Sequence, residues 1–259
     1  MPARIGADLQ GQLSKNLKAV AVIPARWGSV RFPGKPMALL AGTPIIVHVC
    51  AQAAKAKHIQ RVIVATDDQR IFDAVTKAGF HAQLTRADHV NGTSRIAEVA
   101  RDMDADIIVN VQGDEPRIEP ALIDLAVEAL HNAGAHVPVA TVASPFMPGE
   151  DPRDPNLVKV AIAANGHALY FSRALIPFQR DEKTQGAPPL KHVGLYVYRR
   201  EFLPKFIALK PTPLELTENL EQLRILEHGF DIAVAVGHAR FHGVDTPEQL
   251  AKLEALTNQ

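Results

Sequence analysis

Strand-like and helix-like segments alternate from residue 18 to residue 133, and this alternation constrains the fold more than any other feature. The segments predicted to be strands are short, and most are apolar and rich in β-branched residues: 18–23, 61–66, 81–84 and 106–111. The predicted helices begin at Thr43-Pro44, with Thr43 as the cap, and otherwise cover residues 67–78, 93–103 and 120–133. This order predicts an α/β fold with a mostly parallel sheet and helices on both faces.

The pattern changes after residue 133. Four more strands are predicted without long helices between them, at 137–142, 157–163, 168–171 and 193–198, and residues 178–190 form a polar loop. A helix at 215–228, a strand at 232–236 and a helix at 247–256 follow. We therefore expect a disordered tail over 1–17, an α/β core made of 18–133 and 213–259, and an inserted β-rich lobe over 134–212.

Composition excludes several classes of protein. Hydrophobic residues make up 47% of the 259 residues, which is enough for a core, and the single cysteine rules out a disulfide scaffold. The 28 basic and 28 acidic residues give a net charge of zero, which argues against nucleic acid or a membrane surface as partner. No apolar run reaches the ~20 residues of a membrane span, and residues 1–17 lack the pattern of a secretory signal. We expect a cytoplasmic protein.

The loop after the first strand, residues 24–36, predicts an anion site. It contains two glycines and Ser29, together with the cations Arg26, Arg31 and Lys35. Glycines allow the backbone to approach a polyphosphate closely, and the cations neutralise its charge. The loop is not a Walker A motif, because five residues separate its glycines and a proline follows Lys35.

Two carboxylates follow predicted strands and could meet this loop at the carboxyl edge of the sheet. Asp114 comes after the strand 106–111, and Asp245 comes after the strand 232–236. Carboxylates of this kind, together with substrate phosphates, suit Mg²⁺, although each could instead be a helix cap. The polar loop 85–95 could bind a base or ribose, or be an ordinary capped loop.

The segment Ile-Pro-Ala-Arg-Trp-Gly-Ser-Val-Arg-Phe-Pro-Gly-Lys-Pro, residues 23–36, resembles the signature loop of sugar nucleotidyltransferases. From about residue 18 the chain resembles the 3-deoxy-manno-octulosonate (KDO) cytidylyltransferase family, also called CMP-KDO synthetases. The blocks that carry this resemblance run in order through residues 64–67, 85–89, 92–93, 110–116, 156–160, 168–173, 192–196, 220–224 and 243–248.

The resemblance implies that CTP and KDO give CMP-KDO and pyrophosphate, a step toward lipopolysaccharide. It implies a catalytic set of Arg26, Lys35 and Asp114, and Mg²⁺ held by Asp114 and Asp245. The implied nucleotide-binding residues are Ala25, Arg26, Ser29, Lys35, Arg86, His89, Gly92, Thr93 and Gln112. The implied sugar-binding residues are Gln112, Arg173, His192, Tyr196, Glu221 and Gln222. It also implies that the β-rich lobe binds the sugar and forms a homodimer.

The sequence departs from the family pattern at Trp27, where tyrosine is expected, and at Ser94 and Val197, where glutamate and glycine are common. The loop 178–190 also looks short. These departures leave the sugar open, so that 8-amino-KDO or a sialic acid is an alternative substrate. A glycosyltransferase and a non-catalytic nucleotide-binding regulator are rival readings of a different class.

Overall fold

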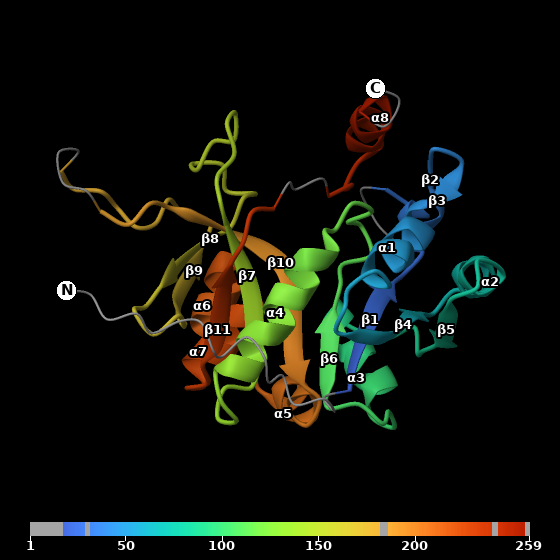
Figure 1. Cartoon of the computed structure of the whole chain (residues 1–259), viewed down its shortest axis with the longest axis horizontal. Coiled ribbons are helices and arrows are strands. Elements are labelled where there is room, and N and C mark those ends of the chain that lie inside the picture. Colours follow the sequence, from blue (N-terminus) through green and yellow to red (C-terminus); the bar gives the residue numbers. More distant parts are fainter. Residues whose placement is uncertain (1–17, 29–31, 182–185, 240–242, 257–259) are drawn as a thin grey trace.

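The computed structural model describes residues 18–28, 32–181, 186–239 and 243–256 (Figure 1). Its strands are β1 (Ala19–Ala25), β2 (Leu39–Leu40), β3 (Thr43–Pro44), β4 (Ile59–Thr66), β5 (His81–Leu84), β6 (Ile107–Asn110), β7 (Val139–Pro145), β8 (Lys159–Ile162), β9 (Ala168–Ser172), β10 (Leu190–Arg199) and β11 (Ile232–Val236). Its helices are the short 3₁₀ helix η1 (Lys35–Met37), α1 (Ile45–Ala53), α2 (Gln69–Lys77), α3 (Gly92–Ala100), α4 (Pro120–Asn132), α5 (Phe202–Ala208), α6 (Pro213–Glu218), α7 (Gln222–Glu227) and α8 (Pro247–Ala255).

One mixed sheet organises the molecule. Its main path has the strand order β11-β7-β10-β6-β1-β4-β5. Strands β6, β1, β4 and β5 are parallel, and β11 is parallel to β7. Strand β10 runs antiparallel to both of its neighbours on this path, β6 and β7. The predicted α/β architecture with a mostly parallel sheet is confirmed.

Helices cover both faces of this sheet, as predicted. The core on one face includes side chains of α1, α2, α4 and α8, for example Ile46, Val75, Ile123 and Leu253. The core on the other face includes side chains of α3, α5 and α7, together with Phe171 of β9. Within the described residues, no helix has both the length and the apolar character needed to cross a bilayer.

The range 134–212 is not separate from the core sheet. Its strands β7 and β10 lie inside the sheet, between β11 and β6, and only the β8–β9 hairpin lies off the main path. The first part of β10 pairs with β7 and β8, and its second part pairs with β6 and β7. An irregularity between Val193 and Tyr196 separates the two parts. The expected lobe therefore reduces to the hairpin and the loops around it.

Two local expectations are wrong. Thr43 does not cap α1, because Thr43 and Pro44 pair with β2 as the short strand β3 and the helix begins without a side-chain cap. The helix expected over 215–228 is two helices, α6 and α7, because Asn219 adopts a left-handed φ of 52° and ends the first. Helix α5 was not predicted. The expected tail 1–17 lies outside the described residues.

Candidate active site

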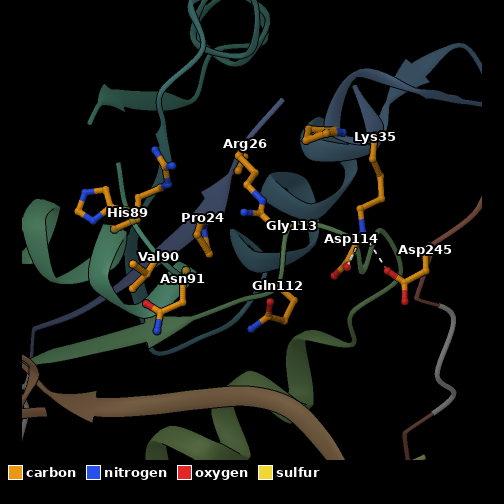
Figure 2. Close-up of a pocket in the computed structure, with 14 residues that line it drawn as sticks. Pro24, Arg26, Lys35, His89, Val90, Asn91, Gln112, Gly113, Asp114 and Asp245 are labelled. Carbon is orange, nitrogen blue, oxygen red and sulfur yellow. Dashed lines mark hydrogen bonds and ion pairs between the residues drawn. The ribbon is translucent and has the colours of Figure 1, made fainter. Parts of the chain in front are cut away.

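The loops that follow β1, β5 and β6 surround a cavity of about 400 Å³ at the carboxyl edge of the sheet. Figure 2 shows that side chains from these loops converge on it with side chains from the loop before α8. The lining residues are Pro24, Ala25, Arg26, Lys35, Pro36, His89, Val90, Asn91, Gly92, Arg95, Gln112, Gly113, Asp114 and Asp245. Ligands of open α/β sheets bind at this edge, so the position agrees with that rule.

Lys35, Asp114 and Asp245, the carboxylate–lysine group, point toward one another in this cavity (Figure 2). The Lys35 ammonium Nζ lies 2.7 Å from Oδ2 of Asp114 and 3.1 Å from Oδ1 of Asp245. One oxygen of each carboxylate therefore faces a single point, which a cation already occupies. The side chains are 15% exposed for Lys35, 31% for Asp114 and 39% for Asp245, so solvent and ligands can reach them.

This oxygen-only arrangement fits Mg²⁺, which takes few protein carboxylates and completes its shell with water and substrate phosphates. Among the described residues, no three His, Cys, Asp or Glu side chains form a closed metal-ligand group. Two carboxylates that share one point with an ammonium suit a metal that arrives with its substrate better than a permanently bound structural ion.

Glycine at position 113 allows the loops after β1 and β6 to approach each other closely. A Cβ on Gly113 would lie 2.9 Å from the backbone oxygen of Pro24 and 3.5 Å from the side chain of Ile46. Because a backbone atom is the nearest obstacle, a larger residue would push the two loops apart. The absence of a side chain at Gly113 thus allows Asp114 to lie opposite the loop after β1.

A second cavity, of about 680 Å³, adjoins the first and shares Gln112, Asp114 and Asp245 with it. Glu115 lines this second cavity and is 9% exposed. Burial and the neighbouring charge of Asp114 raise the pKa of Glu115 to about 8. Nothing in the sequence distinguishes Glu115 from a surface carboxylate, so no role is predicted for it from the sequence.

The loop between β5 and α3 is held by hydrogen bonds around His89. The ring nitrogen Nε2 of His89 lies 2.6 Å from Glu98, and Nδ1 lies 3.1 Å from the Ser94 hydroxyl. Burial acts to raise the pKa of Glu98, but the hydrogen bond with His89 keeps this pKa below its usual value. Arg86 is 70% exposed beside the same carboxylate. Ser94, which departs from the family pattern, thus has a defined partner in the loop.

Arg95 lines the cavity and was missed by sequence reasoning. It is 3% exposed, and its guanidinium lies 3.0 Å from Asp67 at the end of β4. It also donates to the Thr85 hydroxyl and to the backbone oxygen of Arg86 at 3.3 Å. A buried arginine joined to a carboxylate fixes the start of the 85–95 loop to the β4–α2 turn.

His192 and Tyr196 of β10 lie beside each other, away from the cavity lining, and the charge of Glu221 acts on Tyr196. We call these three residues the buried cluster. The ring centroids of His192 and Tyr196 are 5.3 Å apart, and Nε2 of His192 lies 2.9 Å from the Thr141 hydroxyl. Burial lowers the pKa of His192 to about 3, so the imidazole is neutral at physiological pH. Burial also raises the pKa of Tyr196 well above its usual value.

Glu221 connects this buried cluster to the start of α3. Its carboxylate accepts hydrogen bonds from Asn91 Nδ2 at 2.7 Å and from the Thr93 hydroxyl at 2.9 Å. Burial raises the pKa of Glu221, against the hydrogen bond from Thr93. Arg173 donates hydrogen bonds to backbone oxygens, from Nε to that of Glu218 at 2.7 Å and from Nη1 to that of Pro155 at 2.9 Å.

The structure brings together part of the predicted site. The predicted residues that line the first cavity are Ala25, Arg26, Lys35, His89, Gly92, Gln112, Asp114 and Asp245. Arg86, Thr93, Arg173, His192, Tyr196, Glu221 and Gln222 do not line either of the two cavities described above. Ser29 lies outside the described residues. A Cβ on Gly194, at the irregularity of β10, would lie 3.6 Å from Gln112, so Gln112 stands between the cavity and the strand that carries His192 and Tyr196.

The sequence is similar to cytidylyltransferases. The family model described as "Cytidylyltransferase" matches residues 20–232. The 3-deoxy-manno-octulosonate cytidylyltransferase of Trichlorobacter lovleyi is 49% identical over 253 residues, which cover 94% of this chain and all of that protein. The enzyme of the same name from Geobacter metallireducens is also 49% identical and covers 92% of this chain and 96% of its own length.

The fold is also similar to those of solved cytidylyltransferase structures. The structure of CMP:2-keto-3-deoxy-manno-octonic acid synthetase in complex with CTP has a TM-score of 0.88 and 42% identity, covering 93% of this chain and 99% of that chain. A cytidylyltransferase from Leptospira borgpetersenii shares the fold at a TM-score of 0.60 and 18% identity, covering 94% of this chain and 87% of that chain.

Proposed function

The chain belongs to the 3-deoxy-manno-octulosonate cytidylyltransferase family, and on this premise we propose that the two adjoining cavities form its active site. The chain is a nucleotidyltransferase. It transfers CMP from CTP to the sugar acid KDO and releases pyrophosphate. The observation that carries the assignment of the site is the convergence of Lys35, Asp114 and Asp245 at the junction of the two cavities.

CTP occupies the first cavity in this proposal. Arg26 and Lys35 bind the triphosphate, because they are the cations that line the cavity from the loop after β1. The base and ribose lie toward Ala25, His89 and Gly92, which also line this cavity. Figure 2 shows His89 at the side of the cavity opposite Lys35. The hydrogen bonds of His89 and Arg95 hold that loop in one conformation before the nucleotide arrives, which lowers the entropy cost of binding.

We propose that Asp114 and Asp245 hold the Mg²⁺ ion. A bound Mg²⁺ would polarise phosphate oxygens and lower the pKa of the sugar hydroxyl. Because Lys35 occupies the point between the carboxylates in the free chain, its ammonium has to turn toward the phosphates when the metal and CTP enter. Lys35 then stabilises negative charge on the leaving pyrophosphate.

The sugar acid binds next to Gln112, in our proposal, with Arg173, His192, Tyr196, Glu221 and Gln222 arranged behind it. Its anomeric hydroxyl attacks the α-phosphorus of CTP: the new O–P bond forms, the bond to pyrophosphate breaks, and the hydroxyl proton leaves to solvent. Gln112 is suited to align the two substrates because it lines both cavities. His192 serves as a neutral hydrogen-bonding group and not as a base, since burial lowers its pKa to about 3.

The direct test is pyrophosphate release from CTP and Mg²⁺ with a panel of sugars: KDO, 8-amino-KDO and a sialic acid. We expect release with KDO and none without a sugar. Faster turnover of 8-amino-KDO or a sialic acid than of KDO would reassign the substrate and leave the site in place. CTP binding without release on any sugar would favour a nucleotide-binding regulator and overturn the proposal.

We also propose a cytoplasmic homodimer, with the β8–β9 hairpin and the loops of the 134–212 range in the dimer contact and near the sugar. The support is the family resemblance together with the position of this hairpin off the main path of the sheet. Light scattering coupled to gel filtration checks the oligomeric state: we expect twice the 28.1 kDa mass of the chain. Elution as a monomer at micromolar concentration would contradict the dimer.

A further inference from the structure

Trp27 belongs to the loop after β1 to which we assigned the triphosphate (residues 24–36, the phosphate-binding loop), and its indole packs against Arg70 of helix α2. The guanidinium carbon of Arg70 lies 3.3 Å from the centroid of the Trp27 ring, so the two groups stack. Trp27 is half-buried, although the residues on either side of it, Arg26 and Gly28, are exposed. A cation over the face of a tryptophan is the strongest form of the cation–π interaction.

Arg70 is held in place for this contact. Its Nε lies 2.9 Å from Oδ1 of Asp68, and its Nη2 lies 2.6 Å from Oδ2 of the same carboxylate. Asp68 also caps α2 through the backbone N–H of Arg70. Two parallel hydrogen bonds fix the plane of the guanidinium, and therefore the surface on which the indole lies.

The same indole contacts the far end of the phosphate-binding loop. The backbone N–H of Gly34 donates to the Trp27 carbonyl at 3.0 Å. A Cβ on Gly34 would lie 3.0 Å from Cζ2 of Trp27, and Gly34 has a φ of +71°. Only glycine fits this close approach without strain. Residues 27 and 34 thus close the loop at its base, with Arg26 immediately before this closure and Lys35 immediately after it.

We infer that Trp27 is a positioning residue for CTP. The stack on Arg70 and the contact with Gly34 together set the separation of Arg26 and Lys35. This inference rests on the proposed function, because it assigns those two cations to the triphosphate. It goes further in that Trp27 and Arg70 touch no substrate themselves and act through the loop. The Asp67–Asp68 turn then holds both sides of the nucleotide site, since Asp67 binds Arg95 and Asp68 binds Arg70.

Trp27 is the only tryptophan of the chain, so its fluorescence reports on the stack in the free protein, without substrate or turnover. Arg70→Gln should shift the emission to longer wavelength and make the indole more accessible to acrylamide. Arg101→Gln, an exposed arginine at the end of α3, is the matched control and should change neither. Unchanged emission in Arg70→Gln would mean that the stack is absent in solution and would overturn the inference.

Kinetics of the full-length protein separate positioning from direct contact. Loss of an exposed cation–π contact should raise the KM for CTP about fivefold in Arg70→Gln, and about tenfold in Trp27→Ala, with kcat and the KM for the sugar changed less than about twofold. Trp27→Tyr keeps an aromatic face and should stay within about threefold of the unmodified chain. Thermal melting should show Arg70→Gln folded like Arg101→Gln.

Arg70→Lys decides between the two roles, because lysine keeps the charge but loses the planar stack and the paired hydrogen bonds. We expect Arg70→Lys to be as impaired as Arg70→Gln. Recovery of the CTP KM in Arg70→Lys would show that Arg70 contacts phosphate directly and would overturn the positioning role. An equal rise of both KM values with a lowered melting temperature would show a general loss of structure and would also overturn it. An unmodified chain that is inactive while its fluorescence behaves as expected would instead contradict the proposed function.

Discussion

The carboxylate–lysine group and the buried cluster handle charge in opposite ways. In the first, a single ammonium, that of Lys35, pairs with two carboxylates that remain partly exposed. In the second, burial lowers the pKa of His192 and raises that of Tyr196, and therefore both side chains are uncharged at neutral pH. One region therefore presents partly exposed charges to an incoming ligand, whereas the other presents groups that are uncharged at neutral pH.

Removing a charge from the carboxylate–lysine group should give the largest effect. We expect Asp114→Asn to lower kcat by about 10³-fold, because the amide cannot hold the metal at the reacting phosphate. Steady-state pyrophosphate release measures this, and the melting temperature should stay close to that of the unmodified chain because Asp114 is partly exposed. Asp102→Asn removes an exposed carboxylate elsewhere and should be unaffected. Turnover within tenfold in Asp114→Asn would contradict the metal role.

Replacing Lys35 tests whether its ammonium and a metal ion compete for the carboxylates of Asp114 and Asp245. Lys35→Met should lower kcat/KM for CTP by about 10²-fold, because a charged hydrogen bond to phosphate is lost. In the absence of nucleotide, the same variant should bind Mn²⁺ about tenfold more tightly, because the carboxylates no longer have a competing ammonium.

Electron paramagnetic resonance of free Mn²⁺ measures that affinity without turnover. Lys252→Met is the control, since Lys252 lines the adjoining cavity but is not paired with Asp114 or Asp245 in the described structure. Unchanged Mn²⁺ binding in Lys35→Met would contradict this competition.

The buried cluster should make the free energy of unfolding depend on pH. His192 has a folded pKa of about 3 against an unfolded value near 6.5, so the unfolded chain binds the extra proton between these values. The stability that the neutral imidazole contributes is complete above pH ~6.5 and is lost as the pH falls. Between pH 7 and pH 5 this one group should cost about 2 kcal/mol of unfolding free energy.

Urea unfolding at both pH values measures this difference. In His192→Gln the free energy of unfolding should fall about 2 kcal/mol less between pH 7 and pH 5 than in the unmodified chain. His81→Gln, at an exposed position of β5, should leave the pH dependence as it is. An identical pH dependence in His192→Gln would mean that the imidazole is not buried in solution.

The smallest of these effects tests the connection between the two regions. Glu221→Gln removes the negative charge and leaves an amide with a single acceptor atom, so either Asn91 loses its acceptor or the Thr93 hydroxyl has to accept where it now donates. We expect kcat/KM to fall about tenfold for CTP as well as for the sugar. Glu201→Gln, an exposed carboxylate before α5, is the control. If kcat/KM fell for the sugar alone, Glu221 would not support the residues around Asn91 and Thr93 for CTP binding.

The two regions also differ in how much of them the sequence predicts. Asp114 and Arg26 follow short apolar strands directly, and the carboxyl ends of parallel strands meet at one edge, so their convergence follows from local pattern. His192 and Glu221 belong to segments 29 residues apart in the sequence and were assigned only through the family resemblance. Their proximity depends on tertiary packing that no local spacing encodes.

Arg95 and Glu115 line the two cavities, but the local sequence pattern does not identify them. Their sequence surroundings look like a solvent-exposed helix and a turn, because charged residues are usually exposed. Their burial arises from the strands that pack around them. Strand β10 was predicted shorter than it is, and its antiparallel insertion between β6 and β7 was not foreseen, because strand order is not contained in the alternation of apolar segments.

The position of β10 has a consequence for biosynthesis. As the chain leaves the ribosome, β1, β4, β5 and β6 are complete early, but the outer edge of β6 has no neighbour until residues 196–199 have been made. An exposed strand edge invites pairing with other chains. Overexpression at high temperature should therefore favour aggregation of the nascent protein, and truncation before β10 should leave an insoluble fragment even though every residue of the phosphate-binding loop is present.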